Sequence, residues 1–133
     1  MRIAELTIKD EKGNLISLDQ VEAVQGQGIK GDKNARGGSR QVSILSLHTK
    51  KSLENHRDKG LCIPRFYANL IIDGLDEEKI HIGQKIQLGG AILEISQIGK
   101  ECFDNCPMVQ EGERCPLARK IIFAKVRKSG RIF

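Results

Sequence analysis

The sequence predicts one mainly β domain of the barrel or sandwich type, with a few short helices. Short apolar segments recur along the chain, several of them alternating apolar and polar residues, and glycine-containing turns separate them. The chain has 133 residues, of which 39% are hydrophobic and 29% are charged. This length and composition fit a single compact domain over residues 1–133 with enough apolar material for a core.

The first part of the chain predicts a hairpin. Apolar residues at Ile3, Leu6 and Ile8 are followed by the turn-forming residues 10–14 and by a second apolar stretch over residues 15–18. This order of strand, Gly/Asn turn and strand is typical of a β-hairpin. Val21 and Val24 continue the extended pattern.

A glycine-rich segment, residues 26–38, follows the hairpin, and we expect it to be an ordered, functional loop because loops of this length in compact domains are commonly functional. Residues 26–31 match the letters of the dinucleotide fingerprint G-x-G-x-x-G, but no helical apolar stripe follows, which argues against that site. Flexible backbone N–H groups with nearby cations suit a phosphate or another oxyanion, although a solvated basic loop explains the composition equally well. The cations are Lys30, Lys33, Arg36 and Arg40.

Most of the remaining chain predicts short strands. One short surface helix is expected over residues 49–58, ending before Gly60, and a helical turn is expected from Pro116. The apolar, alternating stretches predict strands over residues 41–47, 69–73, 85–88, 91–98 and 123–126.

Charge and composition restrict the partners. Lys and Arg outnumber Asp and Glu by 22 to 17, a net charge of +5, which suits an anionic ligand. The chain has one Tyr, four Phe and no Trp, which argues against nucleic acid because single-strand binders usually offer aromatic platforms. No apolar run approaches the roughly 20 residues of a membrane span, and the N-terminus does not resemble a signal peptide. We therefore expect a cytoplasmic protein, without a membrane partner, whose thiols are reduced.

Three cysteines, Cys102, Cys106 and Cys115, lie within fourteen residues. Lys100 favours the thiolate of Cys102, the form that attacks or carries sulfur. Buried thiols that act as small hydrophobic groups are one alternative, and Cys62 fits that role best. A zinc or iron–sulfur centre is another, with a fourth ligand from Cys62 or a histidine, although the cluster lacks a C-x-x-C pair. The three histidines are His48, His56 and His81.

Taken together, several segments resemble the MOSC domain, which is named for the C-terminal domain of molybdenum cofactor sulfurases. The resemblance covers nearly the whole chain, and the Lys100-Glu101-Cys102 block is similar to the small stand-alone branch of the family. The matching segments are residues 28–32, 40–45, 66–70, 82–83, 99–102 and 122–126.

The resemblance implies a MOSC-like β-barrel that acts in the sulfuration or delivery of the molybdenum cofactor, molybdopterin. It implies Cys102 as a persulfide carrier or molybdenum ligand, and nearness in sequence suggests Cys106 as the resolving thiol. The anionic pterin would contact residues of the matching segments: Gly31, Asp32, Arg36, Arg40, Gln41, Ser43, Asn69 and Lys100. Relatives often have a histidine where this chain has Asn34, and a glutamate where it has Ala68.

Larger relatives carry a pyridoxal-phosphate (PLP) cysteine desulfurase module that this chain lacks. PLP would therefore enter only through a separate desulfurase, and a molybdoenzyme is the other expected partner. Whether the chain is itself an enzyme, with sulfurtransferase activity alongside a partner, stays open. The alternatives are a non-catalytic carrier of the cofactor and a zinc-stabilised structural domain using Cys102, Cys106 and Cys115.

Overall fold

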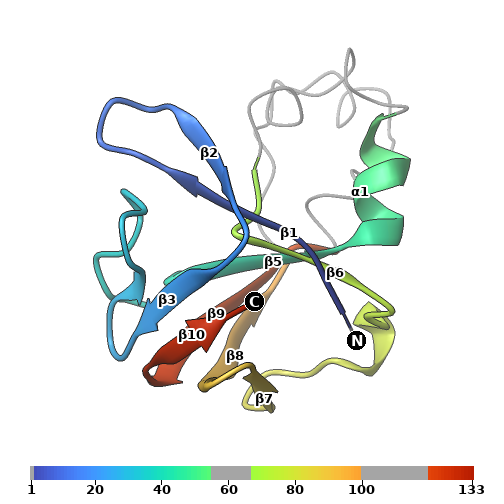
Figure 1. Cartoon of the computed structure of the whole chain (residues 1–133). Helices are drawn as coiled ribbons and strands as arrows, with labels where there is room; N and C mark the ends of the chain where they lie inside the picture. The colour runs from blue at the N-terminus through green and yellow to red at the C-terminus, as the bar shows by residue number, and fades with distance from the viewer. Residues whose placement is uncertain (1, 55–66, 100–119) are drawn as a thin grey trace, which may run out of the picture.

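The computed structural model describes residues 2–54, 67–99 and 120–133, and it confirms a mainly β, barrel-like fold (Figure 1). A seven-stranded sheet curls around a smaller sheet of three strands. Within the described residues, no helix has the length and apolar character needed to cross a bilayer.

The large sheet has the order β2-β1-β6-β5-β9-β8-β7, and all its neighbouring strands are antiparallel except β5 and β6. Its strands are β1 (Arg2–Lys9), β2 (Leu15–Leu18), β5 (Val42–Ser46), β6 (Leu70–Asp73), β7 (Lys85–Leu88), β8 (Ala91–Ile98) and β9 (Ile122–Lys128). Every strand predicted in this sheet is present, with ends that differ by at most two residues.

The small sheet contains two strands that the sequence did not predict. Its order is β10-β3-β4, where β3 is Val21–Val24, β4 is Gly28–Ile29 and β10 is Gly130–Ile132. Strands of two or three residues are too short to show a periodic pattern. Only pairing with β3 makes them strands, so the glycine-rich segment is a loop that carries one short strand.

The helix α1 (Leu47–Glu54) begins two residues earlier than predicted. Ser46 caps it, because the Ser46 Oγ accepts a hydrogen bond from the Thr49 backbone N–H at 3.0 Å. The predicted end at residue 58 lies outside the described residues. A single 3₁₀ turn, η2 (Glu77–Lys79), follows β6.

The core lies between the two sheets. Leu6, Ile44 and Leu93 of the large sheet form one cluster with Ala23 and Ile132 of the small sheet. The outer face of the large sheet is covered at β5 and β6, where α1 packs. Residues of both faces are therefore buried at these central strands, which explains their nearly continuous apolar sequences.

Backbone contact between the sheets requires glycine. A Cβ atom on Gly130 would lie 2.3 Å from the carbonyl carbon of Gly90, and the Gly90 N–H donates to the Arg131 carbonyl oxygen at 2.9 Å. The turn between β7 and β8 thus touches β10 through backbone atoms. This close approach places the last strand against the large sheet.

Candidate functional site

The structure describes seven of the ten predicted site residues. Lys100, Cys102 and Cys106 lie outside the described residues, as do Cys62, Cys115 and His56 of the alternative readings. The persulfide, molybdenum-ligand and zinc hypotheses on these cysteines therefore stay predictions. The seven described residues are Gly31, Asp32, Arg36, Arg40, Gln41, Ser43 and Asn69.

Asp32 anchors the glycine-rich segment to β1. Its residue is only 6% exposed, and its Oδ1 accepts hydrogen bonds from the Lys9 backbone N–H and the Tyr67 hydroxyl, both at 2.9 Å. The Lys33 N–H donates in turn to the Lys9 carbonyl oxygen at 2.7 Å. The other carboxylate oxygen, Oδ2, is buried and has no hydrogen-bond partner among the described residues.

Tyr67 is a component of this cluster that the sequence analysis missed. Its hydroxyl accepts a hydrogen bond from Asn34 Nδ2 at 2.6 Å, and the Lys9 Nζ lies 4.9 Å from the ring centroid, a cation–π contact. Burial of the phenol and the neighbouring Asp32 carboxylate raise the pKa of Tyr67 well above its ordinary value. The available signal was that the chain's only tyrosine stands two residues before the predicted site residue Asn69.

Arg40 precedes β5 in the sequence, and its side chain contacts the end of β8. Its Nε donates to Gln97 Oε1 at 3.2 Å, and the centre of its guanidinium lies 4.8 Å from the centroid of the Phe123 ring. Gln97 in turn donates to the Gly99 carbonyl oxygen at 2.9 Å. Hydrogen bonds within the described parts of the chain leave the two terminal nitrogens of Arg40 unused, so they can bind an anion bidentately.

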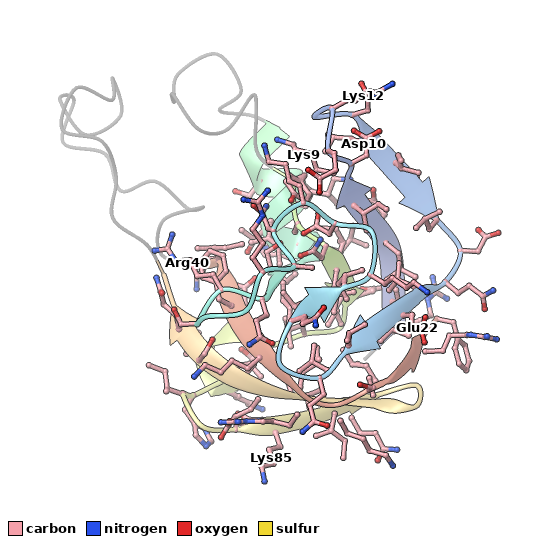
Figure 2. The ribbon with its side chains drawn as sticks, turned by 90° about the vertical axis from the view of Figure 1, so that its left-hand side faces the viewer. Lys9, Asp10, Lys12, Glu22, Arg40 and Lys85 are labelled. Atoms are coloured by element: carbon pink, nitrogen blue, oxygen red, sulfur yellow. The ribbon has the colours of Figure 1, made fainter. Side chains whose placement is uncertain are left out.

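Gly99 and Ile121 meet beside this arginine. The Gly99 N–H donates to the Ile121 carbonyl oxygen at 2.7 Å, which joins the end of β8 to the start of β9. Cys102 follows Gly99 by three residues in the sequence. Figure 2 shows Arg40 at this end of the sheet and Lys9 near the glycine-rich segment, so these two cations stand apart from each other.

Gln41, Ser43 and Asn69 brace the frame of the site. Gln41 donates from Nε2 to the Gly38 carbonyl oxygen and accepts from the Val126 N–H, each at 3.0 Å. Asn69 accepts from the Ser43 N–H and donates from Nδ2 to the Thr7 carbonyl oxygen, again at 3.0 Å. These side chains hold strands and loop together through their polar atoms.

Gly31 and Arg36 complete the described set. Gly31 has a φ of +89°, a conformation that favours glycine, and it permits the turn into Asp32. The Arg36 side chain is 75% exposed and its Nη2 lies 4.0 Å from Glu11 Oε2, a contact that water screens strongly. Arg36 is therefore free to reorient toward a ligand.

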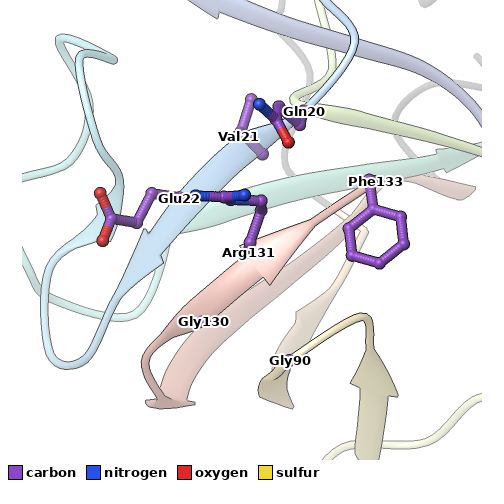
Figure 3. A pocket seen from close by; sticks show the side chains of 7 residues that line it. All are labelled: Gln20, Val21, Glu22, Gly90, Gly130, Arg131 and Phe133. Atoms are coloured by element: carbon purple, nitrogen blue, oxygen red, sulfur yellow. The ribbon is translucent and has the colours of Figure 1, made fainter.

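Two surface pockets among the described residues contain none of the predicted site residues. One has a volume of about 610 Å³ and opens between β3, β10 and the β7–β8 turn (Figure 3). The other, of about 460 Å³, lies beside α1 and η2 and includes Thr49, Glu77 and Lys120. No group of three or more His, Cys, Asp and Glu residues suitable for a metal occurs within residues 2–54, 67–99 and 120–133.

This geometry defines a β-barrel-like domain with an arginine held by Gln97 and Phe123 at one end of its large sheet. The model of the MOSC domain matches residues 31–132, so the chain belongs to the MOSC domain family. This family is associated with sulfuration related to the molybdenum cofactor. No curated protein matches the sequence at a significant level.

Solved structures agree with the fold. The YUAD protein from Bacillus subtilis has a TM-score of 0.68 and 20% identity, with 99% of this chain and 90% of that chain covered. YiiM from Escherichia coli has a TM-score of 0.65 and 19% identity, with 99% and 65% covered. A hypothetical protein of known crystal structure has a TM-score of 0.66 and 20% identity, with 99% and 63% covered. The chain thus spans less than two thirds of the length of the last two.

Proposed function

We propose that this MOSC domain binds the molybdenum cofactor and acts in its sulfuration or delivery, with Cys102 as sulfur carrier or molybdenum ligand. One observation carries the proposal: Arg40 is held by Gln97 and Phe123, and the same Gln97 donates to Gly99, three residues before Cys102 in the sequence. Three residues span at most about 11 Å even when fully extended. The spacing therefore allows Cys102 to approach an anion on Arg40, and the proposal requires that it does.

The residues fit an anionic pterin. The Gln97 amide and the Phe123 ring fix the plane of the guanidinium and leave two terminal NH₂ groups for phosphate oxygens, the bidentate geometry in which arginine is most effective. The bound cofactor would supply the molybdenum centre, a thiophilic metal that accepts sulfur. Arg36 adds a second cation, and Asp32 anchors the glycine-rich segment that carries Arg36 to the end of β1.

In the carrier role, the Cys102 thiolate attacks the terminal sulfur of a desulfurase persulfide. A new S–S bond forms on Cys102, the donor's S–S bond breaks, and the donor cysteine leaves as a thiolate. No net oxidation occurs, so the step needs no further reductant. Lys100, two residues from Cys102 in the sequence, would favour the attacking Cys102 thiolate.

Cofactor binding is tested with two variants that each remove one positive charge. Purified chain is incubated with molybdenum cofactor released from a molybdoenzyme, and retained pterin is measured after gel filtration. Arg40→Ala should lower retention at least about tenfold, because a charge-assisted bond to an anion is lost. Lys85→Ala, at an exposed position on the edge strand β7, should retain the wild-type amount. Equal retention by both variants would contradict the proposal.

Sulfur transfer is tested separately. After incubation with cysteine and a cysteine desulfurase, wild-type chain should release thiocyanate on treatment with cyanide, and Cys102→Ser should release none. Cys62→Ser is the control and should behave as wild type. Pterin retention without cyanide-labile sulfur would identify a carrier of the finished cofactor, and sulfur that stays bound to Cys102→Ser would exclude this cysteine as the sulfur carrier.

A further inference from the structure

We infer that Tyr67 is a positioning residue for the candidate site: its hydroxyl bridges Asp32 and Asn34 and thereby fixes the glycine-rich segment that faces the anionic ligand. The inference rests on the proposed function for its ligand. Neither the family match nor the fold comparisons assign a role to this tyrosine. The bridge itself is defined by hydrogen bonds among described residues.

The direction of each bond follows from the available protons. The Asp32 carboxylate only accepts, so the Tyr67 hydroxyl donates its single proton to Oδ1 at 2.9 Å. The phenol oxygen is then free to accept from the Asn34 amide, at 2.6 Å. One hydroxyl therefore holds two positions of the segment, 32 and 34, at the same time.

Both positions control the local backbone. The Asp32 carbonyl oxygen accepts from the Ala35 N–H at 3.0 Å, and the Asn34 carbonyl oxygen accepts from the Arg36 N–H at 2.9 Å. These turns fix the backbone of residues 32–36, from which the exposed Arg36 side chain extends. The Asn34 side chain has no other hydrogen bond among the described residues, so loss of the bridge releases it. The turn in which the Asn34 carbonyl oxygen accepts from the Arg36 N–H is then released as well.

Three parts of the chain meet at a single carboxylate oxygen. Asp32 Oδ1 joins the end of β1 through Lys9, the glycine-rich segment, and the residues just before β6 through Tyr67. Because Oδ2 is buried without a partner in the described regions, the carboxylate depends on these two bonds. Removing the phenol hydroxyl therefore takes one of the two bonds that hold a buried charge, which costs more than a neutral surface bond.

A matched control variant removes the same kind of hydrogen bond, from a hydroxyl to a carboxylate, elsewhere in the fold. The Thr49 hydroxyl donates to Glu77 Oε1 at 2.7 Å, so Thr49→Val removes a hydroxyl–carboxylate bond much as Tyr67→Phe does. Thr49 belongs to α1 and Glu77 to η2, and neither contributes a hydrogen bond to residues 26–38 among those described. The two variants thus separate a local effect on the segment from general loss of a buried bond.

Hydrogen exchange on the ligand-free chain tests the positioning role directly. In Tyr67→Phe, amides of residues 32–37 should exchange about tenfold faster, which corresponds to about 1.4 kcal/mol, while amides of β8 and β9 keep wild-type rates. Thr49→Val should leave residues 32–37 unchanged. Unchanged exchange in Tyr67→Phe, or faster exchange spread over β8 and β9 as well, would overturn the inference.

Pterin retention separates this inference from the proposed function. If wild-type chain retains the cofactor, Tyr67→Phe should weaken retention about tenfold and Thr49→Val should not. Equal retention by wild type and Tyr67→Phe would refute the positioning role even if exchange is faster. If wild-type chain retains no cofactor while exchange of residues 32–37 still rises locally, the proposed function fails and the bridge to the segment stands.

Discussion

Asn69→Ala is predicted to cause a large loss of stability, because one buried amide joins three strands. Asn69 is 3% exposed. Its Oδ1 accepts from the Ser43 N–H of β5 and its Nδ2 donates to the Thr7 carbonyl oxygen of β1, each at 3.0 Å. The residue itself immediately precedes β6. Truncation leaves two backbone groups, the Ser43 N–H and the Thr7 carbonyl, without these partners in a partly buried place. The Ser43 hydroxyl also loses its 3.2 Å bond to Asn69 Oδ1, but a hydroxyl can rotate to another partner.

The magnitude follows from these two groups. Each buried polar group left unpaired costs about 1–3 kcal/mol, so the expected loss is about 3 kcal/mol of unfolding free energy. For a domain of this size the melting temperature should fall by about 10 °C. Urea unfolding followed by far-UV circular dichroism measures the loss as a lower midpoint at an unchanged m-value.

Asn14→Ala is the matched control. Asn14 is exposed, and its side-chain amide makes a 3.3 Å bond to Asp10 in the β1–β2 turn. Its truncation should cost less than about 0.5 kcal/mol. If Asn69→Ala loses less than about 1 kcal/mol, the reasoning is refuted. If that variant is stable but retains less pterin, Asn69 contacts the ligand as the family resemblance implies.

Two further predictions concern the phenol and the close approach of the sheets. Tyr67 is the only tyrosine, so absorbance at alkaline pH should show no phenol titrating near pH 10 in the folded chain, and Asp32→Asn should lower the pKa of Tyr67 toward that value. Because the pKa of Tyr67 is higher in the folded chain than in the unfolded chain, the phenol's contribution to the unfolding free energy is present below about pH 10 and falls as the pH rises further. An unfolding free energy that stays constant above about pH 10 would contradict the raised pKa. Gly130→Ala should cost about 3 kcal/mol, since its Cβ would lie 2.3 Å from the backbone of Gly90. Gly13→Ala, with no atom within 4 Å but a φ of +87°, should cost only about 1 kcal/mol in the same urea assay, and equal losses would argue against the contact.

Elements with a clear local pattern were predictable. The strand over residues 91–98 alternates apolar and polar residues between glycines, and the structure places β8 over the same residues. The helix was harder, because its start depends on the Ser46 cap and not on its weak apolar pattern. The strands β4 and β10 had no local signal at all, since they exist only by pairing with β3.

The candidate site divides in the same way. The types of its residues were readable, because a run of glycines with arginines and lysines suits an oxyanion wherever it lies. Their assembly was not readable: Asp32 meets Tyr67 across 35 positions, and Arg40 meets Gln97 across 57. Tyr67 was missed because its role comes only from these distant partners.

The sequence by itself determined the class of fold, most of the strands and the chemical character of the glycine-rich segment. These properties follow from periodicity, turn residues and charge, which act over a few neighbouring positions. The tertiary structure alone decided which side chains share a hydrogen bond, which glycines touch another backbone and which carboxylate is buried. These depend on the curl of the large sheet around the small one, which brings distant segments into contact.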